Sequence, residues 1–299
     1  MRSLLIGDNP FLGVSHYSQV RAREKLEYLR LQTVLRVIER AIRCGATGFT
    51  FSVHPVNLEI LSALRDAGTL DQEFELFPIL PYAAGYVRVL NERGMSGLLR
   101  EELSKLSLPN KAKTLLKSSL SAVTLDPVRM MNAYIDVQLA SIPGLKRANL
   151  KAVLLHEVVT DLALSFRANH LFDSYARHIR NKYGVMPGFV TRNLARFAEF
   201  FAESHLSLEH TTIMTPVNGI GFQMNPSRDS CEASLSRLRE SYVIAMSIMA
   251  GGYLRLDQAI DYLRTLSSLS GVAVGVSSEE HAEQTFAGLR SLIKASPAA

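Results

Sequence analysis

The chain has 299 residues, of which 47% are apolar and 20% charged, and its formal net charge is +5 at pH 7. This length and apolar content allow one large core, and no motif combines basic with aromatic residues in the way that indicates nucleic-acid binding. The two cysteines, Cys44 and Cys231, lack CxxC spacing, so neither a disulfide framework nor a thiolate zinc site is indicated. No segment approaches the roughly 20 apolar residues that span a bilayer. We expect a cytoplasmic protein, more plausibly an enzyme than not, that acts on a small molecule; nothing in the sequence indicates its oligomeric state.

Short apolar segments alternate with segments of helical periodicity along most of the chain. The expected strands are residues 4–7, 48–52, 75–80, 152–156, 186–190, 211–215, 243–247 and 272–276. Helical periodicity is clear between them, as in LQTVLRVIERAIRCG and NLARFAEFFAES. Because alternation of strand and helix implies a parallel sheet, and eight such units favour a closed barrel, we predict one α/β domain over residues 1–299, a (β/α)8 TIM barrel.

One interval is too long for a single crossover. About 70 residues separate the third and fourth expected strands, and they read as several helices, including SGLLREELSKLS and DPVRMMNAYIDVQLASI. Because a structureless loop of this length is unusual, we predict a helical insertion over about residues 85–145. Its helices either cover the barrel alone or form a lid over the active site, and the sequence leaves both interpretations open.

Polar residues follow the expected strands at the end where ligands gather in a parallel barrel. Asp8 and His16 follow the first strand, His54 the second, Tyr82 the third and His156 the fourth. His156 comes directly after the apolar run KAVLL, which favours a functional role over that of a core histidine. For His16 and His54 a solvated loop is an equally good interpretation. Together these candidate catalytic residues could transfer protons as general acids or bases.

The alternative is a metal site formed by the three histidines with Asp8 or Glu157, because imidazole and carboxylate groups bind zinc or iron. Neither HxH nor HExxH spacing occurs around His16, His54 and His156, so we assign no metal ligands. Two further hypotheses stay open. One is a different enzyme on this barrel, such as a lyase, an isomerase or a metal-dependent hydrolase, and the other is a ligand-binding protein without catalysis.

Several segments resemble the aldo-keto reductase superfamily in their order and composition. AIRCGATGFTFS is similar to the family's second strand and its approach, LKAVLLHEVV to the fourth strand with its active-site histidine, and VIAMSIMAGGYL to the seventh. The closest similarity is GVSSEEHAEQTF, which resembles the last strand and the helix start that face the adenosine phosphate of NADP. The resemblance implies an oxidoreductase with NADP as cofactor and His156 as the family's histidine. The residues that it places at the cofactor are Asn218, Ser247, Gly275, Ser277 and Ser278.

The chain departs from the family at three positions of its catalytic tetrad. Ser52 stands where an aspartate follows the second strand, and the expected tyrosine is missing from SVHPVNLE. Where a lysine would end the third strand, the chain reads Leu80, Pro81 and Tyr82. Without that lysine and aspartate nothing in the comparison lowers the pKa of a tyrosine, so Tyr82 would be a weak acid at neutral pH. We therefore predict a divergent member with an altered active site.

The start of the last expected helix could also bind an anion for reasons that do not depend on the family resemblance. The hydroxyls of Ser277 and Ser278, with the backbone amides that follow, could hold an anion at a helix N-terminus. Glu279 and Glu280 oppose this, because they already favour the helix dipole and would repel a phosphate nearby. A cofactor site and an ordinary acidic helix start are both consistent with these residues.

Overall fold

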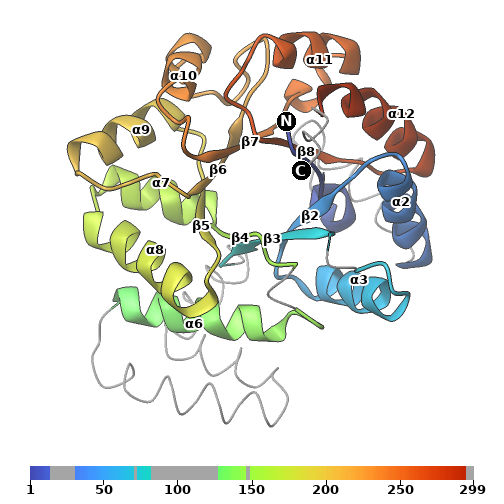
Figure 1. The fold of residues 1–299 in the computed structure, drawn as a ribbon, viewed down its shortest axis with the longest axis horizontal. Helices are drawn as coiled ribbons and strands as arrows, with labels where there is room; N and C mark the ends of the chain where they lie inside the picture. The colour runs from blue at the N-terminus through green and yellow to red at the C-terminus, as the bar shows by residue number, and fades with distance from the viewer. Residues whose placement is uncertain (14–30, 71–72, 82–126, 146–148, 294–299) are drawn as a thin grey trace, which may run out of the picture.

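The computed structural model of the protein describes residues 1–13, 31–70, 73–81, 127–145 and 149–293. Eight parallel strands close into a barrel in chain order, as the view in Figure 1 shows. The strands are β1 (Ser3–Gly7), β2 (Gly48–Ser52), β3 (Glu75–Leu80), β4 (Ala152–Leu155), β5 (Met186–Val190), β6 (Thr212–Pro216), β7 (Tyr242–Met246) and β8 (Gly271–Gly275). Because β1 pairs in parallel with both β2 and β8, the sheet has no edge. The predicted (β/α)8 barrel is confirmed, and each predicted strand boundary is within one residue of the observed boundary.

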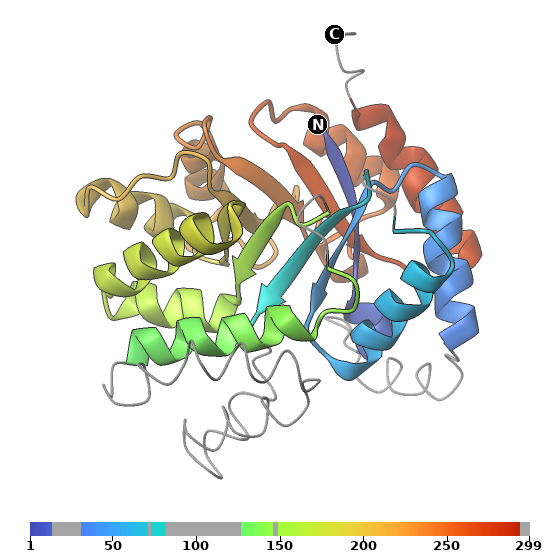
Figure 2. The same cartoon turned by 60° about the horizontal axis from the view of Figure 1, so that its bottom comes forward.

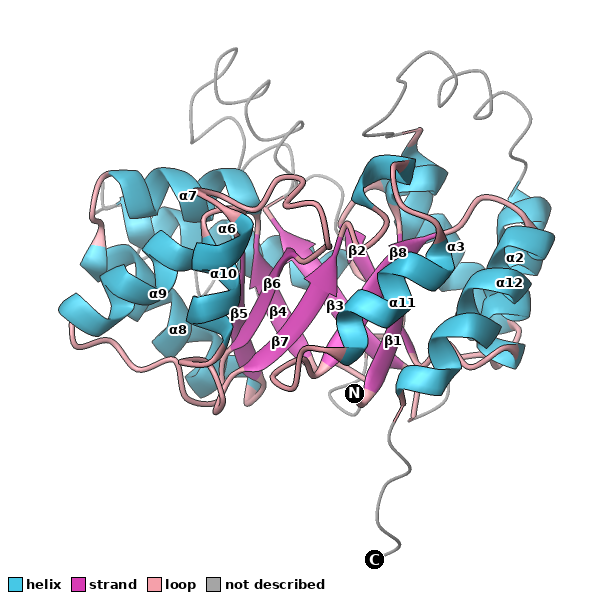
Figure 3. Ribbon diagram, turned by 90° about the horizontal axis from the view of Figure 1, so that it is seen from above, coloured by secondary structure: helices cyan, strands magenta, loops and turns pink. Residues whose placement is uncertain are grey.

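Helices form a ring outside the barrel, and Figure 3 shows the strands enclosed by them. The described helices are α2 (Leu31–Arg43), α3 (Pro55–Asp66), α6 (Pro127–Ser141), α7 (Glu157–Ser165), α8 (Asn169–Tyr183), α9 (Leu194–Glu203), α10 (Arg228–Leu235), α11 (Leu256–Arg264) and α12 (Glu279–Leu289). Short 3-10 turns lie at η1 (Asn9–Leu12), η2 (Ala250–Gly252) and η3 (Arg290–Leu292). In the described residues no helix is both long and apolar enough to cross a membrane.

The predicted helical insertion, about residues 85–145, falls largely outside the described residues, and its described part contains α6. Helix α6 lies beside α8, as Figure 2 also shows. Asp136 on α6 joins the two helices: its Oδ1 accepts a hydrogen bond from the Tyr183 hydroxyl at 2.6 Å and lies 2.8 Å from His178 Nε2. Lys182 forms an ion pair with the same carboxylate. These contacts keep the pKa of Asp136 below its usual range even though burial opposes them.

The core has two layers, because alternate residues of each strand point inward and outward. The outer layer packs strand residues such as Phe49 and Phe51 against the helices. The inner layer consists of strand residues alone: Leu5, Phe77, Ala152, Leu154, Val190, Met214, Ile244 and Ala273. One close approach requires glycine: a Cβ at Gly188 would lie 2.2 Å from Cδ2 of Leu154. Since apolar side chains fill the barrel, polar chemistry is confined to its ends.

Candidate active site

The histidines that follow β2 and β4 occupy equivalent turns. His54 caps the N-terminus of α3, and His156 caps that of α7. In each turn the Nδ1 atom accepts a hydrogen bond from the backbone N–H two residues later, at 3.2 Å from Val56 or Val158. An accepting Nδ1 places the proton of a neutral imidazole on Nε2. Burial is the main cause that lowers the pKa of both rings, so both are neutral at pH 7.

His156 points toward the mouth of the barrel. It continues the inward-facing positions of β4, two residues after Leu154, and its backbone N–H donates to the Leu80 carbonyl at 2.7 Å. Within the described part of the chain its Nε2 has no hydrogen-bond partner. His156 therefore presents a neutral N–H donor at the carboxyl end of β4.

An ion pair joins the ends of β4 and β5 beside His156. Arg192 donates from Nε and Nη2 to the two carboxylate oxygens of Glu157, at 3.0 and 2.7 Å. Glu157 raises the pKa of His156 and Arg192 lowers it, although the effect of burial is larger than either. The ion pair thus acts electrostatically on the imidazole as well as joining two strand ends.

A second carboxyl fixes the end of β5. Asp161 accepts a hydrogen bond from the Thr191 hydroxyl at 2.5 Å and a longer one from the Arg192 backbone N–H at 3.4 Å. Burial raises the pKa of Asp161 despite these hydrogen bonds. The sequence indicates Glu157 as a possible partner of a histidine and Arg192 as a polar residue at the end of a strand, and it predicts no role for Asp161. The polar run TRN after the fifth apolar strand indicates that Arg192 lies at the mouth. Its pairing with Glu157 could not be predicted, because it depends on β4 lying beside β5.

Asp8 is the predicted site residue that follows β1. Its Oδ2 atom accepts hydrogen bonds from the Ser52 backbone N–H and from the Asn57 amide, both at 2.8 Å. Burial raises the pKa of this carboxyl more than the hydrogen bonds lower it. The family's aspartate after the second strand is absent from the sequence, yet a carboxyl does reach the end of β2, because Asp8 contributes it from β1.

Asn218 lies in the loop after β6 and is 0% exposed. Its Nδ2 donates to the carbonyls of Phe222, at 2.9 Å, and Ser247, at 3.3 Å, and its Oδ1 accepts from the Phe222 N–H at 2.8 Å. Ser247 follows β7 with a φ of 53°, in the left-handed region that residues other than glycine seldom adopt. In this structure the Asn218 amide therefore organises the loops after β6 and β7, and direct contact of Asn218 or Ser247 with a cofactor stays a prediction.

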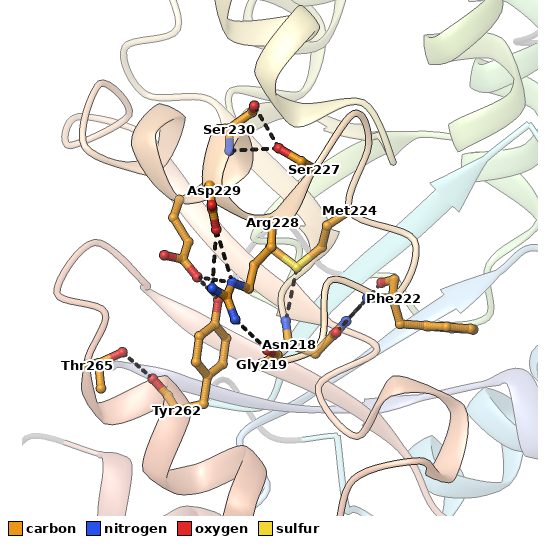
Figure 4. A network of polar contacts seen from close by, with 11 residues as sticks. Asn218, Gly219, Phe222, Met224, Ser227, Arg228, Asp229, Ser230, Tyr262 and Thr265 are labelled. Carbon is orange, nitrogen blue, oxygen red and sulfur yellow. Dashed lines mark hydrogen bonds and ion pairs between the residues drawn. The ribbon is translucent and has the colours of Figure 1, made fainter.

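A polar network, drawn in Figure 4, holds the same loop against two helices. Arg228 at the start of α10 donates from Nη1 to the Gly219 carbonyl at 2.8 Å and pairs with Glu232 at 3.3 Å. The Tyr262 hydroxyl of α11 donates to Glu232 at 2.6 Å. Burial and the nearby carboxylate raise the pKa of Tyr262, so it remains a protonated donor at neutral pH. The loop after β6 is thus held by contacts with α10 and α11 as well as by its own hydrogen bonds.

The predicted phosphate-binding segment lies between β8 and α12. Ser278 is the N-cap of α12, and its hydroxyl accepts a hydrogen bond from the His281 N–H at 3.2 Å. A Cβ at Gly275 would lie 2.7 Å from Cδ of Pro10, so glycine here permits η1 to pack over the end of β8. Ser277, which directly precedes the N-cap residue Ser278, is partly exposed. Glu279 pairs with Arg36 of α2 at 3.1 Å.

Two predicted catalytic residues, His16 and Tyr82, fall outside the described residues. Among the residues that are described, no group of three or more His, Cys, Asp or Glu side chains is arranged to hold a metal ion. The described site is therefore a barrel mouth with His156, Glu157 and Arg192 on one part, Asp8 on another, and the start of α12 beyond β8.

This fold and mouth define a (β/α)8-barrel protein with polar groups at the carboxyl ends of its strands. No protein-family model and no curated protein matches the sequence. Among solved structures, a Pseudomonas aeruginosa protein assigned to the aldo-keto reductases matches with a TM-score of 0.60 and 10% identity, over 97% of this chain and 91% of that one. An aldo-keto reductase of Bacillus halodurans in its holo form matches with a TM-score of 0.55 and 9% identity, over 99% and 88%.

The aldose reductase of Schistosoma japonicum is a further match, with a TM-score of 0.53 and 10% identity, over 96% of this chain and 82% of that one. These similarities extend along nearly the whole chain, although few residues are identical. The protein has the barrel fold of the aldo-keto reductases, as the sequence resemblance implied. Activity and cofactor do not follow from a likeness of fold and need their own argument from the site.

Proposed function

We propose that the protein is an oxidoreductase of the aldo-keto reductase type that reduces a carbonyl group with NADP(H) as cofactor. The observation that carries this proposal is His156. On this fold, at the end of β4, its ring is neutral and its Nε2–H has no partner within the described part of the chain. Such a donor can bind the oxygen of a carbonyl and stabilise the negative charge that develops there during reduction.

The groups at the start of α12 fit the phosphate-bearing end of a dinucleotide in their donor chemistry. They comprise the Ser277 hydroxyl, the backbone amides of the first turn and the guanidinium of Arg36, whose side chain is 57% exposed. Arg36 already pairs with Glu279, but an exposed ion pair contributes only about 0–1 kcal/mol, so a phosphate could replace the carboxylate at little cost. When bound, the nicotinamide ring would supply the hydride.

Reduction adds a hydride to the carbonyl carbon and a proton to its oxygen. A neutral imidazole N–H is a good hydrogen-bond donor but a weak acid, so His156 orients and polarises the carbonyl rather than giving up its proton. Asp8 is one acid that the sequence indicated as a proton source, and burial raises its pKa, so it retains a proton at a higher pH than an exposed aspartate. Tyr82, outside the described residues, is the other acid that the sequence indicated.

Two measurements on the full chain test the proposal. Titration with NADPH and NADH, followed by nicotinamide fluorescence, should show saturable binding, with NADPH bound more tightly. A panel of aldehydes and ketones should then include compounds whose reduction consumes NADPH in equal molar amounts. Absence of binding of either dinucleotide would overturn the proposal, and binding without reduction of any carbonyl would limit it to the cofactor site.

A further inference from the structure

We propose that Arg192 selects substrates with a carboxylate beside the carbonyl group, so that the preferred substrates are 2-oxo acids. The inference rests on the proposed function, since it names the substrate class of that site. Arg192 would bind the carboxylate while His156 binds the neighbouring carbonyl oxygen. The product would be the corresponding 2-hydroxy acid.

The position of Arg192 is the first reason. Val190 belongs to the inner layer of the barrel, so strand alternation directs Arg192, two residues later, toward the mouth. The backbone of Arg192 is held on both sides: its N–H donates to Asp161 at 3.4 Å, and its carbonyl accepts from the Asn225 N–H at 3.0 Å. The base of this long side chain is therefore fixed before any ligand arrives, which lowers the entropy lost on binding.

The guanidinium provides the second reason. Its Nε and Nη2 atoms bind Glu157, which orients the plane of the group. A guanidinium has two edges that can each bind a carboxylate with two parallel hydrogen bonds, and Glu157 uses the edge formed by Nε and Nη2. The other edge carries Nη1, which has no hydrogen bond to any described residue, and the side chain is 31% exposed. Glu157 thus holds the arginine in place and leaves a donor edge for a second carboxylate.

The third reason is that the two recognition groups are neighbours through Glu157. Glu157 follows His156 directly in sequence and contacts Arg192, and the charge of Arg192 acts on the imidazole. A carbonyl at His156 and an anion at Arg192 can therefore belong to one small ligand. A 2-oxo acid has this arrangement, because its carboxylate is bonded to the carbonyl carbon.

The test compares an acid with its ester in the full-length protein. The substrates are 2-oxobutanoate and methyl 2-oxobutanoate, which share the reacting ketone and differ in charge. For Arg192→Gln we expect kcat/KM to fall about 10- to 100-fold for the acid, as for loss of a charge-assisted hydrogen-bond pair, and to change little for the ester. Arg192→Lys should recover only part of the loss, because lysine keeps the charge but not the planar fork.

Arg167→Gln is the matched control, since Arg167 also pairs with a carboxylate, that of Glu203, but on the exposed surface between α7 and α9. It should leave both substrates unaffected. Equal losses for acid and ester in Arg192→Gln would overturn the inference and show that Arg192 only positions its neighbours.

A binding measurement keeps the inference testable if no carbonyl is reduced and the proposed function fails. Oxalate, a non-reacting analogue of a 2-oxo acid, is titrated into the protein by calorimetry, with and without NADP+. Binding to the wild type and to Arg167→Gln, but at least 10-fold weaker binding to Arg192→Gln, would support the anion site independently of turnover. Failure of oxalate to bind the wild type would overturn it.

Discussion

The turns after β2 and β4 are built alike and differ in what surrounds them. His54 and His156 cap the following helices with the same atom, at the same distance, and burial lowers the pKa of both. His54 is followed by Pro55, whereas His156 is followed by Glu157 and its ion pair with Arg192. The cap alone therefore does not distinguish a structural histidine from a functional one. The argument for function at His156 comes from its neighbours in space.

The strongest test of this comparison removes each ring in turn. Asparagine is a good N-cap, so His156→Asn and His54→Asn should keep both helices while deleting Nε2. We expect carbonyl reduction by His156→Asn to fall about 100-fold, since loss of one donor to a developing oxyanion costs about 10²–10³-fold. His54→Asn should lose much less. The measurement is kcat with saturating NADPH, and equal losses in the two variants would remove the distinction between the turns.

Asp8 provides a test near the His54 turn, because it binds the Ser52 backbone and Asn57. Its pKa is raised in the folded protein, so its relative contribution to stability is fully present below the unfolded pKa of about 3.9 and is lost as pH rises through the folded pKa. Each unit between the two pKa values corresponds to about 1.4 kcal/mol. Asp8→Asn removes this titration while keeping an oxygen that can accept both hydrogen bonds.

Urea unfolding of the wild type and Asp8→Asn at pH 4, 6 and 8 measures this effect. The free energy of unfolding of the wild type, relative to the variant, should decrease as the pH rises. A difference that is constant across this range would mean that Asp8 titrates like an exposed aspartate. Reduction by Asp8→Asn, assayed in parallel, tests Asp8 as the proton source.

The similarity of the two turns predicts similar effects on stability. Replacing an N-cap residue by alanine typically costs about 1 kcal/mol. We therefore expect His54→Ala and His156→Ala to lower the free energy of unfolding by about this amount each, as measured by urea denaturation. If His156→Ala were several times more destabilising than His54→Ala, its effect on activity could not be separated from loss of structure.

The smallest expected effect lies away from both turns, at Arg36. If Arg36 binds the phosphate that distinguishes NADPH from NADH, Arg36→Met should weaken NADPH binding by about fivefold or less, because the group is exposed. Binding of NADH should be unchanged, which makes it the internal control in the same fluorescence titration. Equal weakening of both dinucleotides would place Arg36 outside the phosphate site.

Much of the architecture could be predicted from the sequence because it depends on local patterns. Apolar runs of about five residues between amphipathic segments were sufficient to predict eight parallel strands. The same runs correctly placed Asp8, His54 and His156 at strand ends. The contacts of these residues could not be predicted in the same way, since Asp8 finds its partners, Ser52 and Asn57, on another part of the chain.

Asn218 shows most clearly that a sequence motif does not predict the hydrogen-bond partners of a residue. In sequence it resembles a family residue at the cofactor, and in the structure its amide hydrogen-bonds to the backbone of Phe222 and Ser247; contact with a cofactor stays a prediction. Gly275 is similar, because the room it provides is taken by Pro10. A residue type at the right place in a motif carries no information about which neighbour satisfies its hydrogen bonds.

The sequence by itself determined the barrel, its strand order and the set of polar groups at its mouth, because hydrophobic periodicity along the chain dictates which elements form and which face they bury. Only the tertiary structure decided how those groups combine. Closure of the barrel brings β1 against β2 and β4 against β5, so Asp8 meets Ser52 and Glu157 meets Arg192. Burial then shifts the pKa values of Asp8 and His156, and this effect depends on what surrounds a residue in space rather than in sequence.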